Sequence, residues 1–209
     1  MNSRQYFLSQ MQPGDVIALS GHALISYLID AFTGPVWPWQ SESCLSHLAI
    51  VERPFDGTDV WITESTIYKG KNGPQSRSLS DLLLEYSDDK DQAWWLQLNP
   101  KLRAYGDWAA FQSAVTEAEA QDKYDIPGLF AFLVRNIPVI GSRFCQTESA
   151  KRLFCSGYAV WLLESSQILR GINYSKEAPQ DVVEMGIWCQ YQQIFGPPGG
   201  TLARFATIG

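Results

Sequence analysis

The stretch HLAIVERPFDGTDVWITE, residues 47–64, contains two apolar runs on either side of a polar segment. The first run is His47–Val51, the second is Val60–Glu64, and the segment between them carries the turn pair Asp56-Gly57. Short runs rich in β-branched and aromatic residues that flank such turn residues are typical of a β-hairpin. The stretch therefore predicts two neighbouring antiparallel strands.

The same hairpin is predicted to bring two polar side chains to one face. If Val51 pairs with Val60, His47 lies opposite Glu64, and the Cβ atoms of such direct partners are about 5 Å apart. A carboxylate at this position accepts a hydrogen bond from one imidazole nitrogen and leaves the other nitrogen for a reaction partner. A slip of one residue would turn Glu64 to the opposite face, where it is a solvated carboxylate at a strand end.

Elements on either side of the hairpin complete an α+β pattern. Apolar runs and turn residues predict strands at 16–19, 93–98 and 202–207, and helices at 23–32, 81–85, 108–121, 130–134, 155–169 and from 179. Ser80 is the expected N-cap of the helix at 81–85, and Gly171 the C-cap of the helix at 155–169. The pattern predicts an antiparallel sheet or half-barrel packed against helices, in one domain spanning 1–209.

Cys155 begins the most informative of these helices. Residues 158–163, YAVWLL, are apolar around the whole circumference, which predicts a buried helix. A thiol at a helix N-terminus is favoured as thiolate by the macrodipole, and the free N–H groups there can hold an oxyanion. Ser156 and Gly157 keep this first turn small and leave room for a substrate. The alternative is an inert cysteine of the core.

A cysteine nucleophile needs a base, and the chain has only two histidines, His22 and His47. His22 follows Ser20-Gly21 and precedes a predicted helix, as a loop or cap residue does. His47 opens a buried strand, so it is the candidate base. The alternative for His47 is a half-buried ring held by structural hydrogen bonds.

Composition and charge exclude several classes of function. A net charge of −6 and an isoelectric point of about 4.9 argue against nucleic acid as a partner. No apolar run approaches the roughly 18 residues of a membrane span, and no signal peptide is recognisable at the N-terminus, so we expect a cytoplasmic protein. Phage origin or non-classical export stays open. Four cysteines at unrelated spacings and two histidines form no metal-ligand pattern, so neither a metal nor another cofactor is predicted.

Several short motifs occur in an order that resembles one known family, the circularly permuted NlpC/P60 proteins, and the YiiX/YebB-like group in particular. In these proteins the histidine strand precedes the cysteine helix. The motifs that carry the resemblance span residues 12 to 183 and are Gln12–Ile17, Ser46–Val51, Thr63–Ser65, Tyr124-Asp125, Phe154–Tyr158 and Pro179–Asp181.

The resemblance implies a papain-like fold in which Cys155 is the nucleophile, His47 its base and Glu64 the residue that orients the base. It also implies that Tyr124 lines the oxyanion site, next to Ser156 in the first turn of the helix. The alternative for Tyr124 is an aromatic residue packed beneath the helix that follows Pro127.

The function implied is that of a cysteine hydrolase, an amidase or peptidase acting through a thioester acyl-enzyme. Its expected substrate is a small peptide or amino-acid amide, of the kind found in bacterial cell walls. Two alternatives remain open. One is a lipid acyl hydrolase or acyltransferase, for which the aromatic loop at 36–40 would be a lipid-facing lip. The other is a non-catalytic binding module on the same fold.

Overall fold

The computed structural model describes residues 3–20, 45–86, 91–121, 155–174, 177 and 179–197. Six strands form one antiparallel sheet in the order β4-β3-β2-β1-β5-β6. The strands are β1 (Val16–Ser20), β2 (His47–Arg53), β3 (Trp61–Tyr68), β4 (Lys71–Ser78), β5 (Gln92–Leu98) and β6 (Trp188–Phe195). The helices are α1 (Ser3–Leu8), α3 (Leu79–Glu85), α4 (Pro100–Arg103), α5 (Trp108–Gln121), α7 (Cys155–Ser165) and α8 (Pro179–Glu184). The predicted α+β class with an antiparallel sheet is confirmed.

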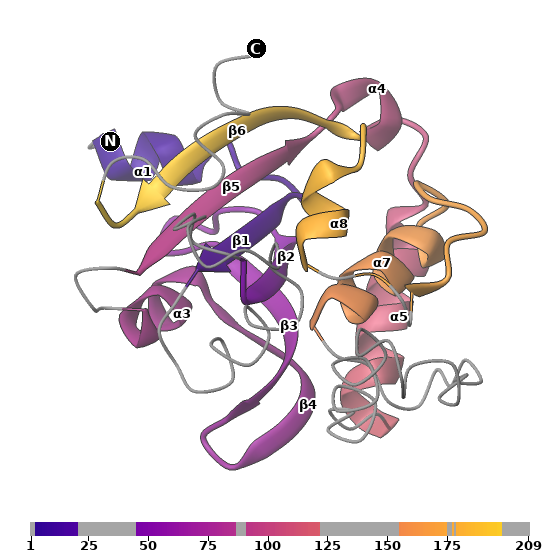
Figure 1. Cartoon of the computed structure of the whole chain (residues 1–209), viewed down its shortest axis with the longest axis horizontal. Coiled ribbons are helices and arrows are strands. Elements are labelled where there is room, and N and C mark those ends of the chain that lie inside the picture. The colour runs from indigo at the N-terminus through magenta and orange to yellow at the C-terminus, as the bar shows by residue number, and fades with distance from the viewer. Residues whose placement is uncertain are drawn as a thin grey trace, which may run out of the picture.

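Helices pack on both faces of the sheet. One face carries α5, α7 and α8, and the other carries α1 and α3 (Figure 1). Successive residues of a strand point to opposite faces, so β2 contributes Leu48 and Ile50 to the first core and Ala49 and Val51 to the second. Burial of both faces explains why the strands at the centre of the sheet are continuous apolar runs rather than alternating ones.

The hairpin of β2 and β3 forms, but its predicted register is wrong by two residues. Val51 lies opposite Ile62 rather than Val60, and a bulge interrupts the pairing between Val51 and Arg53. The physical reason is the turn: the Asp56 side chain accepts hydrogen bonds from the backbone N–H groups of Thr58 and Asp59, which takes these residues out of the ladder. Because side chains alternate with a period of two, a shift of two residues keeps each side chain on its predicted face.

Two strands were not predicted, and both lie at the edges of the sheet. β4 is polar and contains Gly73 and Pro74, and it pairs with β3 through a tight turn at Lys69 and Gly70. Both turn residues have positive φ, 47° and 82°, as the two-residue turns that suit a twisted hairpin require. Proline is tolerated there because an edge strand leaves one side of its backbone unpaired. β6 is the opposite edge strand, beside β5.

Helices α3, α5, α7 and α8 lie at predicted positions, with corrections at two caps, whereas α1 and α4 were not predicted. The helices predicted at 23–32 and 130–134 and the strand predicted at 202–207 lie outside the described residues. α5 covers the predicted 108–121, but the N-cap of α3 is Ser78, whose side chain accepts from the N–H of Asp81, and not Ser80. α7 ends at Ser165, before the predicted 169, and Gln167 follows it in the left-handed conformation (φ 64°). Gly171 also has a positive φ, 71°, but lies too far beyond the end of α7 to cap it. Among the described residues no helix is both long and apolar enough to cross a membrane.

Candidate active site

A buried chain of charged side chains crosses three neighbouring strands on the α3 face of the sheet. His47 is the first residue of β2, Glu64 lies in β3 and Arg77 in β4. Glu64 Oε2 is 2.5 Å from His47 Nε2, and Glu64 Oε1 is 2.5 Å from Arg77 Nη2. Glu64 is fully buried, and the His47 side chain is 11% exposed. The structure thus brings together the predicted histidine and carboxylate, although they are diagonal neighbours rather than direct partners.

Cys155 reaches this chain of charges from α7. It is the first residue of the helix and is buried, and its side chain interacts with the His47 imidazole by charge and by a hydrogen bond. Since Nε2 of the ring faces Glu64, Nδ1 is the nitrogen that remains for the sulfur. The structure therefore brings His47 and Glu64 into contact, and the Cys155 thiol acts on the same imidazole from α7 by charge and hydrogen bonding.

The electrostatics of the site favour a charged imidazole. Burial acts to lower the pKa of His47, but the charges of Cys155 and then Glu64, with a hydrogen bond to each, outweigh it and raise this pKa to about 10. An opposite charge on each side of a buried ring stabilises the imidazolium because a low-polarity interior screens charge weakly. At neutral pH His47 is consequently a proton donor.

Two hydrogen bonds fix the position of the helix that carries Cys155. The Tyr158 hydroxyl lies 3.0 Å from Thr63 Oγ1 of β3, in the buried layer between helix and sheet. The Ser156 hydroxyl donates to the backbone carbonyl of Glu177 at 2.6 Å, and Ser156 is fully buried. The Ser156 side chain therefore anchors the start of α7, and its expected role at the oxyanion site stays a prediction. α7 packs directly on β2 and β3, the strands that hold His47 and Glu64.

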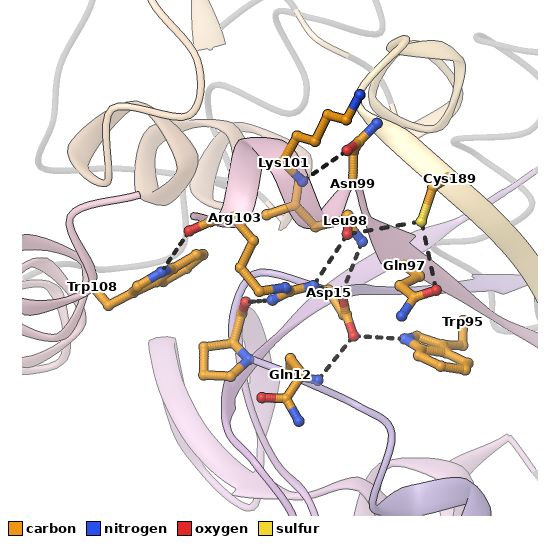
Figure 2. A network of polar contacts seen from close by, with 11 residues as sticks. Gln12, Asp15, Trp95, Gln97, Leu98, Asn99, Lys101, Arg103, Trp108 and Cys189 are labelled. Carbon is orange, nitrogen blue, oxygen red and sulfur yellow. Dashed lines mark hydrogen bonds and ion pairs between the residues drawn. The ribbon is translucent and has the colours of Figure 1, made fainter. Parts of the chain in front are cut away.

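The turn at Pro13-Gly14-Asp15, part of the first shared motif, stabilises the sheet rather than contributing to the site. The buried carboxylate of Asp15 accepts hydrogen bonds from the backbone N–H groups of Gln12 and Leu98 and from Trp95 Nε1, at 2.8 to 2.9 Å, and forms an ion pair with Arg103 (Figure 2). Burial raises the pKa of Asp15, whereas the charge of Arg103 and the hydrogen bonds act against this. This network joins the start of β1 to the end of β5 and to α4, so the motif is structural.

Two residues near the site were missed by the sequence analysis. Arg77 lies in β4, a strand that the polar sequence did not predict. Tyr86 follows α3, and the pKa of its half-buried phenol is raised well above the ordinary value, first by burial and then by the charges of Glu64 and Cys155. Of the predicted residues, Tyr124 and His22 lie outside the described residues, as does the aromatic loop at 36–40.

Comparison with protein-family models finds no family that matches the chain, and no curated protein matches it. Among solved structures, the crystal structure of the metalloprotein YiiX from Escherichia coli O157:H7 is similar to it. The TM-score is 0.54 at 14% sequence identity, and the match covers 90% of this chain and 98% of that chain. The fold is YiiX-like. At this level of identity the likeness to YiiX concerns the fold alone.

A search of the described residues finds no group of three or more His, Cys, Asp or Glu side chains that could hold a metal ion. The ring nitrogen Nε2 of His47 and the oxygen Oε2 of Glu64 are already directed at each other. Free thiols in this part of the chain are Cys155, which is buried, and Cys189, which is exposed on β6. The side chains that the described fold brings together are thus suited to proton transfer and thiol chemistry.

Proposed function

We propose that the protein is a cysteine hydrolase that cleaves an amide bond through a thioester acyl-enzyme. The observation that carries the proposal is the buried series Glu64, His47, Cys155, in which the central ring interacts with a carboxylate on one side and a thiol on the other. A nucleophile, a base in contact with it and a third group that orients the base are the arrangement that nucleophilic catalysis requires.

The reaction that this arrangement supports has two stages. The Cys155 thiolate attacks the carbonyl carbon, and a carbon–sulfur bond forms while the N–H groups of the first turn of α7 stabilise the oxyanion. His47 gives its proton to the departing nitrogen, the carbon–nitrogen bond breaks and a thioester remains. Water then attacks the thioester, its proton passes to His47, and the carboxylic acid and Cys155 are released. Glu64 keeps the ring oriented throughout.

We propose a small peptide or amino-acid amide as the substrate, on the strength of the motifs shared with the permuted NlpC/P60 proteins. A lipid ester remains the alternative substrate. Although YiiX is described as a metalloprotein, the described residues here do not fit a metal centre, so no step passes through a metal. Activity on a panel of amino-acid amides and peptides, absent in Cys155→Ala, supports the proposal. Activity on lipid esters alone would favour the alternative.

The mechanism itself is tested by alkylation with iodoacetamide at pH 6, followed by mass spectrometry of the four cysteines. Cys189 is the internal control because it is an exposed thiol whose side chain bonds to Gln97, and because no histidine among the described residues is seen to pair with it. We expect Cys155 to react faster than Cys189 although it is buried, because reactivity follows the thiolate fraction. A His47→Gln variant should remove this preference. If Cys155 stays unmodified while Cys189 reacts, the protein is not a thiol hydrolase of this kind.

A further inference from the structure

Arg77 has a place in the fold that the three-residue site does not explain. The cation is buried, with a side-chain exposure of 6%, and it contacts two carboxylates through one nitrogen: Glu64 Oε1 at 2.5 Å and Glu85 Oε2 at 2.8 Å. Its Cζ atom lies 4.0 Å from the ring centroid of Tyr68. Among the described residues, Nε and Nη1 of Arg77 have no hydrogen-bond partner, and neither does Glu64 Oε1, whose contact with Arg77 is an ion pair.

A buried cation with so few hydrogen bonds is not expected to stabilise the fold. A buried guanidinium loses its hydration, and the loss is recovered only when its donors and charge are well matched. Here the hydrogen bonding is incomplete, whereas the charge is placed directly behind the carboxylate that holds His47. The pKa of Arg77 is raised above its ordinary value because the charge of Glu64, followed by Glu85, outweighs the effect of burial. Arg77 therefore keeps its positive charge throughout the pH range in which the site would work.

The register of the sheet makes Arg77 the counterpart of His47. Arg77 lies opposite Ile62, two residues from Gln75, the direct partner of Glu64 on β4. On the other side, continuing the observed pairing of β2 with β3 places Ala49 opposite Glu64 and His47 two residues beyond it. Glu64 thus has one diagonal neighbour on each side, and each of its oxygens is directed at one of them.

We propose that Arg77 is a positioning residue that keeps the Glu64 carboxylate turned so that Oε2 faces His47. The proposal rests on the proposed function, because its effect reaches Cys155 only through Glu64 and His47. Charges then alternate along the series Arg77, Glu64, His47, Cys155. The other titratable groups that face it are Glu85 and Tyr86 at the end of α3 and Tyr68 of β3.

The test is the rate of Cys155 alkylation by iodoacetamide between pH 5 and 9 in Arg77→Met. We expect the rate at pH 6 to fall about tenfold and the midpoint of the profile to move up by about one pH unit. Arg77→Lys, which restores the charge, should recover most of the loss. Arg53→Met is the matched control, since Arg53 also lies over an aromatic ring, Trp61, and pairs with a glutamate, but does not contact Glu64.

A second comparison separates positioning from a merely structural role. In a Glu64→Gln background, Arg77→Met should change the alkylation profile little, since the residue through which it acts is gone. A profile of Arg77→Met that superimposes on the wild type, or an equal loss with and without Glu64, overturns the proposal. Arg77→Gln replaces Arg77→Met if circular dichroism shows that the latter does not fold. Wild-type protein in which Cys155 does not react would instead count against the hydrolase itself.

Discussion

The charge state of His47 is the property on which the chemistry depends, and it can be measured directly. An imidazole with its ordinary pKa of 6.5 is mostly neutral at pH 7, whereas a pKa of about 10 leaves roughly one ring in a thousand neutral. The difference corresponds to about 5 kcal/mol in favour of the charged ring, at about 1.4 kcal/mol for each pH unit. We therefore predict that His47 keeps its proton through neutral pH and loses it only as the pH rises through about 10.

The assay is an NMR titration of the imidazole nitrogens from pH 5 to 11. Since the chain has two histidines, a His22→Gln variant leaves the signal of His47 alone. Removing the thiol by Cys155→Ala should lower the pKa of His47 by at least about one pH unit, because the charge of Cys155 is the largest influence that raises it. Cys189→Ala is the matched control and should leave the titration unchanged. A ring that titrates near 6.5, or one insensitive to Cys155→Ala, refutes the reasoning.

Two further predictions concern the contacts that hold the site in place. Tyr158→Phe should lower the free energy of unfolding by about 1 kcal/mol through loss of the bond to Thr63, and a double-mutant cycle with Thr63→Val should show non-additive effects in urea denaturation. Asp15→Asn should lower the free energy of unfolding by about 3 kcal/mol or more, because it leaves the charge of Arg103 without its buried partner. The alkylation rate of Cys155 in the folded Asp15→Asn protein should stay unchanged, and a loss of reactivity there would contradict a structural role for Asp15.

The strands at the centre of the sheet could be predicted because both their faces are buried. β1, β2 and β5 need apolar side chains on each face. This need is visible in the sequence as nearly continuous apolar runs, such as Val16–Leu19 and Ala93–Leu98. The helix at 108–121 could be predicted for a similar reason, since its apolar residues recur at helical spacing. In both cases the local pattern and the tertiary packing agree.

The edge strands could not be predicted, because their pairing does not depend on apolar side chains. β4 is held by the ladder to β3 and by a turn at Lys69-Gly70, and its sequence, KNGPQSRS, has the composition of a loop. Because β4 was not predicted as a strand, Arg77 could not be placed beside Glu64 from the sequence. The register of the hairpin could not be predicted for another reason, since it depends on the hydrogen bonds that the Asp56 side chain accepts within the turn.

The order of strands in the sheet explains why so distant a set of residues forms one site. β4, β3 and β2 are neighbours, and each contributes one charged side chain of alternating sign to the same face: Arg77, then Glu64, then His47. The sheet therefore fixes three of the four charges independently of α7, which adds only the sulfur. It follows that Cys155→Ala should leave the Arg77–Glu64–His47 series intact, whereas any change that shifts β3 by one residue would turn Glu64 away from both partners at once.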